Sequence, residues 1–247
     1  MTATKKRRLD QLLVERGLAA SREKARALIL AGQVLVDGRK AEKAGDAVAA
    51  ASRIEVAETP RYVSRAGLKL EAALEQFRIS VAGRVCLDIG ASTGGFTDCL
   101  LQHGALRVHA VDVGAGQLAW KLRADPRVIL HEKLNARYLR LEDLGERVWL
   151  ATCDVSFISV TKILPVLPGV LEPDGEMVVL VKPQFEVGRG QVGKGGLVRD
   201  PALHQLACRR VEEALAALGY RSTLMASPIL GAEGNQEFLL HATPATR

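Results

Sequence analysis

The chain has 247 residues, of which 48% are hydrophobic and 25% are charged, with 34 Lys and Arg against 28 Asp and Glu. This composition is ordinary for a globular protein with a substantial core. The apolar runs, such as residues 177–181, are too short to cross a bilayer, and the amino-terminus lacks a secretory pattern, so we expect a cytoplasmic protein. The 4 cysteines form no C-x-x-C pair and have no histidine at ligand spacing, so no metal site is expected.

The positive charge is concentrated near the amino-terminus. Residues 1–60 hold 12 basic and 8 acidic residues, a net of +4, whereas the remaining three-quarters of the chain holds 22 and 20. A basic head on a nearly neutral body is typical of a small module that contacts a polyanion. A merely solvated, charged surface would give the same count, so charge alone leaves both interpretations open.

The first predicted elements form a small unit near the lower size limit for independent folding. Residues 7–17 and 21–32 carry apolar side chains at helical spacing, and each run stops at a glycine. Ser21 is the expected amino-terminal cap of the second helix. Residues 33–40 then alternate like a short strand that contains a D-G turn.

Residues 8–39 (RLDQLLVERGLAASREKARALILAGQVLVDGR) resemble an S4 domain, the RNA-binding module of ribosomal protein S4 and of several RNA-modifying enzymes. The resemblance extends over residues 7–55 and leaves open which RNA is bound. It implies that a set of basic side chains faces an RNA backbone, namely Arg7, Arg8, Arg22, Lys24 and Arg26. The composition changes at residues 57–67, where Pro60 interrupts regular pairing. We therefore expect an S4-like domain over residues 1–59, a linker over 60–66 and a larger domain over 67–247.

From residue 83 onward, strand-like runs alternate with helical ones. The expected strands cover residues 84–90, 107–113, 127–132, 147–155, 176–182, 220–229 and 235–243. The expected helices cover residues 95–103, 117–124, 158–167 and 200–219. Apolar, β-branched runs separated by helices predict an α/β fold, a doubly wound seven-stranded sheet with helices on both faces.

Residues 87–101, LDIGASTGGFTDCLL, pass from a strand to a helix through glycines, as chains do where a ligand approaches the backbone. A triphosphate loop is disfavoured because Phe96 stands where a lysine must meet phosphate charge. A dinucleotide fingerprint is disfavoured because Ser92 replaces its second glycine. S-adenosylmethionine (SAM), a sulfonium ligand without phosphate, fits the turn best.

The acid at the end of the next strand supports the same cofactor. Asp112 is placed to bind ribose hydroxyls, and Asp88 can orient the turn and favour a positive ligand. Taken alone, Asp112 would be interpreted as a strand-end carboxylate that caps a loop. Together these features predict a Rossmann-like class I methyltransferase core, in which Asn135 is expected near the adenine by resemblance. The residues expected to hold SAM are Asp88, Gly90, Ala91, Ser92, Gly94, Gly95, Phe96, Asp112, Val113 and Asn135.

The residues at the ends of the fourth and fifth strands indicate which kind of atom is methylated. The fourth strand ends in C-D-V-S-F rather than the N-P-P-Y of amino-group methyltransferases. Cytosine C5 methyltransferases attack the ring with a cysteine thiolate. Cys153 lies inside an apolar strand and lacks the preceding proline and the nearby base of those enzymes, so it is interpreted as a core residue. Asp154 and Lys182 remain, at strand ends where ligand crevices lie in such sheets. An isolated Lys182 would be expected to extend its ammonium group to the protein surface. Paired with Asp154 across adjacent strand ends, it indicates instead a site that methylates an oxygen nucleophile.

The whole chain is similar to the TlyA family, bacterial ribosomal RNA 2′-O-methyltransferases in which an S4 domain precedes an FtsJ-like (RrmJ-like) domain. The matching stretches are residues 63–70, 87–101, 154–159, 182–200 and 234–240. The resemblance implies a SAM-dependent methyl transfer to cytidines of small-subunit ribosomal RNA, large-subunit ribosomal RNA or both. It also implies a Lys-Asp-Lys-Glu tetrad at Lys69, Asp154, Lys182 and Glu237, in which Lys69 and Glu237 rest on the family alone. The oligomeric state stays open.

A glycine-rich loop over residues 187–199 is expected to contact RNA phosphates through Arg189, Lys194 and Arg199, with a plain mobile loop as the alternative. Two other functions compete with methyl transfer. One is an S4 assembly factor with a vestigial methyltransferase fold, which an intact tetrad and glycine turn disfavour. The other is a membrane-active hemolysin, a name attached to this family, which the lack of a spanning or strongly amphipathic segment disfavours.

Overall fold

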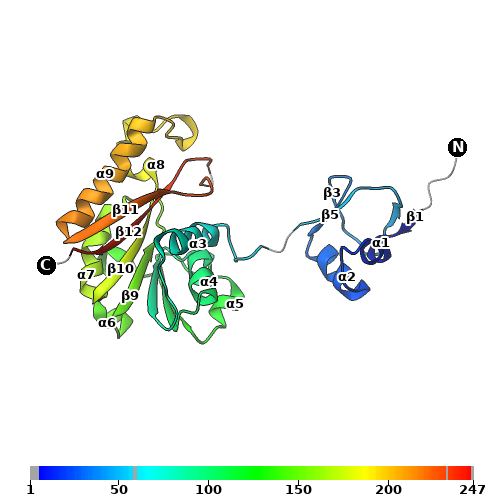
Figure 1. Ribbon diagram of the computed structural model, residues 1–247, viewed down its shortest axis with the longest axis horizontal. Helices are drawn as coiled ribbons and strands as arrows, with labels where there is room; N and C mark the ends of the chain where they lie inside the picture. The colour runs from blue at the N-terminus through cyan, green and yellow to red at the C-terminus, as the bar shows by residue number, and fades with distance from the viewer. Residues whose placement is uncertain (1–5, 58–59, 232, 246–247) are drawn as a thin grey trace. The chain divides into compact units, whose positions relative to one another are not determined.

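The computed structural model describes residues 6–57, 60–231 and 233–245. The chain divides into two compact units, Met1–Pro60 and Arg61–Arg247 (Figure 1). Part of the segment expected as a linker packs into the second unit. Tyr62 is buried there beneath Gly67, and the backbone N–H of Val63 donates to Asp98 Oδ2 at 2.8 Å.

The first unit contains two helices, α1 (Leu9–Glu15) and α2 (Arg22–Leu30), close to the predicted ranges. Ser21 caps α2 as predicted, because its side chain accepts from the backbone N–H of Lys24 at 3.1 Å. The strands are short and antiparallel. β1 (Lys6–Arg8) pairs with β4 (Ala47–Ala49), while β2 (Val34–Val36) lies between β3 (Arg39–Lys40) and β5 (Ile54–Val56).

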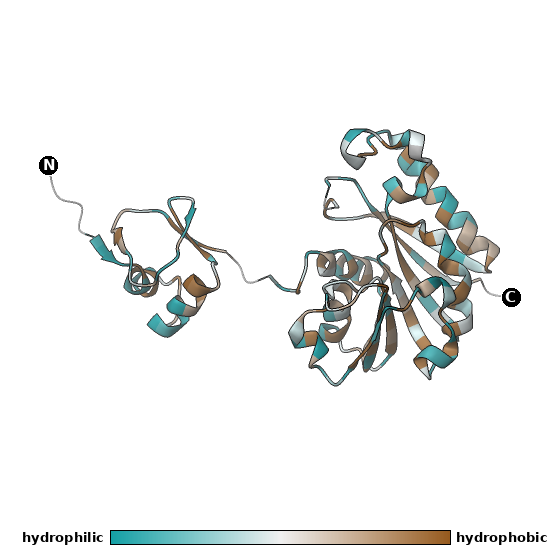
Figure 2. Cartoon of the chain, turned by 180° about the vertical axis from the view of Figure 1, so that it is seen from behind, coloured by the Kyte–Doolittle hydropathy of each residue, from teal (hydrophilic) through white to brown (hydrophobic). Residues whose placement is uncertain are grey.

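The second unit is built on a seven-stranded sheet in the order β11-β12-β10-β9-β6-β7-β8, which confirms the predicted α/β class. The parallel strands are β6 (Val85–Ile89), β7 (Arg107–Asp112), β8 (Val128–Glu132), β9 (Val148–Cys153) and β10 (Leu171–Val181). The last strand, β12 (Phe238–Pro244), runs antiparallel between β10 and β11 (Tyr220–Ala226). Figure 2 shows that the strands are predominantly hydrophobic, as expected for a sheet covered on both faces.

Two hydrophobic clusters cover the two faces of this sheet. One contains side chains from α3 (Ala66–Phe77), α4 (Gly95–Gln102) and α5 (Trp120–Arg123), among them Leu70, Leu100 and Leu122. The other contains side chains from α6 (Leu141–Leu144), α7 (Leu167–Val170) and α9 (Pro201–Ala217). The short helix α8 (Pro183–Glu186) follows β10. The helices thus lie on both faces, as Figure 1 shows.

Two of the helices predicted from the sequence differ in the structure. Residues 158–167 form two 3-10 turns, η2 (Val160–Lys162) and η3 (Leu164–Val166), before the short α7. Pro165 and Pro168 explain this difference, because proline has no backbone N–H for a continuous α-helix. The helix expected over residues 117–124 is reduced to α5. Within the described part of the chain, no helix is both long and apolar enough to span a membrane.

Candidate active site

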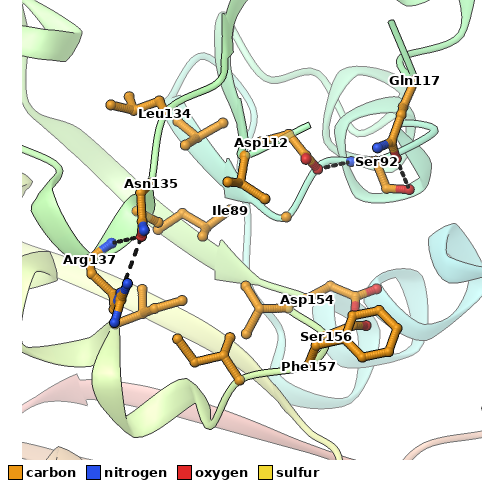
Figure 3. A pocket seen from close by; sticks show the side chains of 17 residues that line it. Ile89, Ser92, Asp112, Gln117, Leu134, Asn135, Arg137, Asp154, Ser156 and Phe157 are labelled. Atoms are coloured by element: carbon orange, nitrogen blue, oxygen red, sulfur yellow. Dashed lines mark hydrogen bonds between the residues drawn. The ribbon is translucent and has the colours of Figure 1, made fainter. Parts of the chain in front are cut away.

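The strands β6, β7 and β9 point their carboxyl ends at one edge of the sheet, around a cavity of about 470 Å³ (Figure 3). Six residues that sequence analysis assigned to the cofactor or to catalysis line it, namely Gly90, Ser92, Asp112, Val113, Asn135 and Asp154. An apolar wall completes the cavity, with Ile89, Val111, Leu134, Ala136, Ile158 and Ile163. A ligand with a flat, largely apolar ring and polar groups at its edge would fit against such a wall.

The glycine turn after β6 depends on the missing side chain at several positions. Gly90 has φ 82°, and a Cβ there would clash with the backbone carbonyl of Asp154. A Cβ on Gly94 (φ 100°) would clash with Leu122, and one on Gly95 would clash with Ser64. The turn can therefore lie directly against the end of β9 and the start of α3 only with glycine at these positions.

Asp112 joins the end of β7 to this turn. Its Oδ2 accepts from the backbone N–H of Ser92 at 2.8 Å (Figure 3). Its Oδ1 accepts from the backbone N–H of Gly114 at 2.7 Å. Both bonds orient the carboxylate at the cavity edge and leave lone pairs for a further donor. Ser92 also donates to Gln117 Oε1 at 3.3 Å, which ties the turn to the segment before α5.

Asp88 lies under the turn rather than in the cavity lining, and it is fully buried. Its Oδ2 accepts from Thr97 Oγ1 at 2.6 Å and its Oδ1 accepts from Thr152 Oγ1 at 3.3 Å. Burial raises the pKa of Asp88 to about 7, because hydrogen bonds from the threonines only partly offset the loss of hydration and Asp154 adds repulsion. Phe96, in α4, is also buried in the hydrophobic cluster on that face of the sheet, but it lines a smaller neighbouring hollow.

A smaller hollow of about 170 Å³ adjoins the cavity and shares Gly90, Ser92, Asp154 and Ser156 with it. Lys182 lines this hollow. Its Nζ lies 2.6 Å from Asp154 Oδ1 and donates to Ser156 Oγ at 2.9 Å. Asp154 Oδ1 is buried and accepts no hydrogen bond within the described part of the chain. Its contact with Lys182 is therefore an ion pair only.

A second ion pair joins Lys69 Nζ on α3 to Glu237 Oε2 beside β12. Both side chains are nearly buried, at 10% and 3% exposure. The strand register explains why this pair lies near the first one. Val181 is opposite Phe238 in the antiparallel ladder, so Lys182 and Glu237 are the next residues on each strand. The structure thus gathers the four residues of the expected tetrad at one edge of the sheet.

Three of the arginines expected to face RNA converge in the first unit. Arg8, Arg22 and Arg26 all form ion pairs with the buried carboxylate of Asp10. Arg7, in contrast, pairs with Glu15. Lys24 is exposed and lies roughly 200° around α2 from Arg22, at about 100° for each residue.

In the second unit, Lys194 and Arg199 are exposed on a loop, while the side chain of Arg189 lies outside the described part of the chain. This loop is fastened by Asn235, whose side chain accepts from the N–H of Val198 at 2.8 Å and donates to the carbonyl of Gly196 at 2.9 Å. Four polar residues of these sites were not predicted from the sequence, namely Asp10, Ser64, Ser156 and Asn235. Of these, Ser156 carried the clearest signal, because it follows Asp154 by two residues at the end of a buried strand.

The strand order, the glycine turn and the acidic strand ends define a class I methyltransferase fold. A family model described as FtsJ-like methyltransferase matches residues 62–243, and an S4 domain model matches residues 7–54. The chain therefore belongs to the FtsJ-like methyltransferases and, among them, to the TlyA family.

Individual proteins agree with this assignment. The chain is similar to the 16S/23S rRNA (cytidine-2′-O)-methyltransferase TlyA of Mycobacterium tuberculosis, with 51% identity over 236 residues that cover 94% of this chain and 88% of that protein. The solved structure of a candidate hemolysin from Streptococcus thermophilus is 44% identical, with a TM-score of 0.74 over 98% of this chain and 90% of that one. A more distant structure, an N1-methyltransferase from Burkholderia thailandensis with bound S-adenosylhomocysteine, shares the fold with a TM-score of 0.52 at 21% identity over 74% of this chain and 80% of that one.

Proposed function

We propose that this protein transfers a methyl group from SAM to a ribose 2′-hydroxyl of ribosomal RNA, at a cytidine of the small subunit, the large subunit or both. The TlyA relative supports the substrate class, because its name states this reaction. The observation that carries the chemistry is the Lys182–Asp154 ion pair, which lies where the two cavities adjoin. The S4-like unit with its converging arginines supports RNA as the partner.

The residues of the larger cavity fit SAM. The Asp112 carboxylate is held at the rim and can accept hydrogen bonds from ribose hydroxyls, while the apolar wall around Leu134 suits an adenine. Gly90 leaves room beside the end of β9 that a Cβ would fill, which suits the close passage of the methionine end. When bound, SAM supplies a methyl group on a positively charged sulfur. The carboxyl group of Asp88 beneath the turn favours that charge in its ionised form, which is reached as the pH rises through its raised pKa of about 7.

The residues around the smaller hollow orient the acceptor. A ribose hydroxyl is a weak nucleophile, so its oxygen must be held in line with the methyl group and its proton must be removed. The Lys182 ammonium donates a hydrogen bond to that oxygen, and the Asp154 carboxylate accepts one from the hydroxyl. A lone pair of the oxygen then faces the methyl group, and the hydroxyl proton passes to the Asp154 carboxylate as the new O–C bond forms. The Lys69–Glu237 pair keeps the neighbouring positions charged and rigid while adding no net charge.

Labelled methyl transfer tests this function directly. Purified ribosomal subunits are incubated with the protein and SAM that carries a tritiated methyl group. We expect RNA-bound label from the wild type and at least about 100-fold less label from Lys182→Met over the same time. SAM binding without transfer to either subunit would contradict the proposed reaction. Absence of SAM binding in calorimetry would favour an assembly factor, and leakage from liposomes would favour a hemolysin.

A further inference from the structure

Asp10 is a fully buried acid at the centre of the basic face of the first unit. Arg8 approaches it with two nitrogens, Nε at 3.1 Å from Oδ1 and Nη2 at 3.0 Å from Oδ2. Arg22 Nη2 lies 3.0 Å from Oδ2, and Arg26 Nε lies 3.6 Å from the same oxygen. One carboxylate therefore holds guanidinium groups from β1 and from α2.

The acid is fixed, whereas the arginines reach solvent. The backbone N–H of Asp10 donates to the carbonyl of Ala44 at 3.0 Å, and the neighbouring Leu9 belongs to the core of the unit. The exposed fractions of the side chains are 45% for Arg8, 51% for Arg22 and 56% for Arg26. The hydrogen bond from Arg8 holds the pKa of Asp10 well below its usual range, so the acid stays ionised.

This arrangement concentrates positive charge that would otherwise disperse. Guanidinium groups this close repel one another, and long exposed side chains lose rotamer freedom when they are held together. The carboxylate offsets both costs, since charge-assisted bonds to an arginine fork fix direction as well as distance. The cluster keeps a net positive charge with N–H donors turned toward solvent, where an RNA phosphate can accept them.

We propose that Asp10 is a positioning residue for RNA binding, which presents Arg8, Arg22 and Arg26 as one preformed cradle for the phosphodiester backbone. This inference rests on the proposed function, because it assumes that the first unit binds RNA. It makes a prediction opposite to that of net charge. Removing an acid from a basic face strengthens binding to a polyanion if only total charge matters. If Asp10 acts by positioning, removing its charge weakens binding.

The test measures the affinity of the full chain for dye-labelled ribosomal RNA by fluorescence anisotropy over a series of KCl concentrations. For Asp10→Asn we expect the affinity for RNA to be about tenfold weaker. We also expect the slope of log affinity against log KCl concentration to be shallower by about one, which corresponds to the loss of about one phosphate contact. The matched control is Glu15→Gln, which removes the same charge beside the exposed Arg7. We expect the control to bind as tightly as the wild type or slightly more tightly. Unchanged or tighter binding by Asp10→Asn would overturn the proposal.

A second variant covers the case in which Asp10→Asn does not fold. Arg22→Lys/Arg26→Lys keeps both charges on half-exposed side chains but loses the planar fork, so we expect affinity about fivefold weaker. Equal affinity would contradict a cradle of defined geometry. If the wild type binds RNA no better than an Arg8→Ala/Arg22→Ala/Arg26→Ala variant, the RNA role of this unit fails. If the wild type binds and Asp10→Asn matches it, only the positioning role fails.

Discussion

Lys182 and Asp154 stand at the ends of the adjacent parallel strands β10 and β9, with Nζ and Oδ1 2.6 Å apart. Both side chains are mostly buried, at 11% and 16% exposure, although they line the hollow that adjoins the larger cavity. A buried pair of this kind is weak evidence for stability, because desolvation offsets much of the attraction. We propose a catalytic role because the pair lies where the two cavities adjoin.

Lys182→Met should separate catalysis from cofactor binding. The substitution keeps a long side chain but removes the ammonium group that orients the hydroxyl, so we expect the methyl transfer rate to fall about 100-fold or more. The affinity for SAM, measured by calorimetry, should stay within about threefold, because Asp112 and the glycine turn are untouched. The control Lys121→Met removes a lysine paired with Asp98 elsewhere in the unit and should keep its activity. Equal loss of transfer and of SAM affinity by Lys182→Met would refute the catalytic role.

Asp112→Asn should weaken the binding of SAM. The amide keeps the shape but loses the charge that accepts from two backbone N–H groups and, as proposed, from ribose hydroxyls. Hydrogen bonds to charged groups are worth about 1.5–3 kcal/mol, so we expect a dissociation constant about 10- to 100-fold larger. Glu132→Gln is a matched control on the neighbouring strand. Glu132 accepts from Gly116 N at 2.7 Å but lies outside the lining of the larger cavity. Equal weakening in both variants would remove Asp112 from the cofactor site.

The sequence predicted the sheet and the strand-end residues well, because the relevant signals are local. A buried strand that ends in an acid and a glycine turn can be recognised without knowing its neighbours, as with Asp88 and Asp112. The Lys69–Glu237 pair could not be derived in this way, since its partners are 168 positions apart and each resembles an ordinary surface charge. Only the resemblance to a family indicated that they belong together.

The cluster of arginines around Asp10 also could not be predicted from local sequence patterns. The arginines of α2 were visible in the sequence, but Asp10 lies in a run that reads as one turn of an amphipathic helix. Its importance depends on complete burial and on β1 bringing Arg8 back beside α2. The short 3-10 turns after β9 were missed for another reason, since the apolar spacing there outweighed the two prolines.

Gly90→Ala should disturb the site more than an equivalent change elsewhere. Gly145 also has a positive φ, 77°, but has open space around it, so Gly145→Ala isolates the backbone strain at about 1 kcal/mol. A Cβ on Gly90 must in addition displace the carbonyl of Asp154, so we expect a loss of about 2–4 kcal/mol in urea unfolding. We also expect Gly90→Ala to bind SAM more weakly than the wild type, whereas Gly145→Ala should bind it normally. Equal destabilisation by the two variants would show that the close approach to β9 is unimportant.

The pH dependence of stability should report Asp88. Because burial raises its folded pKa from about 4 to about 7, the protonated acid contributes stability that is fully present below about pH 4 and is lost as the pH rises through 7. His109 and His131 act in the opposite direction, since burial lowers their pKa and stability is lost as the pH falls below about 6.5. We therefore compare unfolding free energies of the wild type and Asp88→Asn across this range. The difference should shift in favour of the variant as the pH rises, and a constant difference would contradict a raised pKa.

The position of the transferred methyl group tests the central claim most directly. Ribosomal RNA labelled by the protein is hydrolysed completely in alkali, which cleaves every linkage that has a free neighbouring 2′-hydroxyl. We expect all of the label in alkali-stable dinucleotides that begin with cytidine. Label released in mononucleotides would place the methyl group on a base and would contradict an acceptor site built around Lys182 and Asp154.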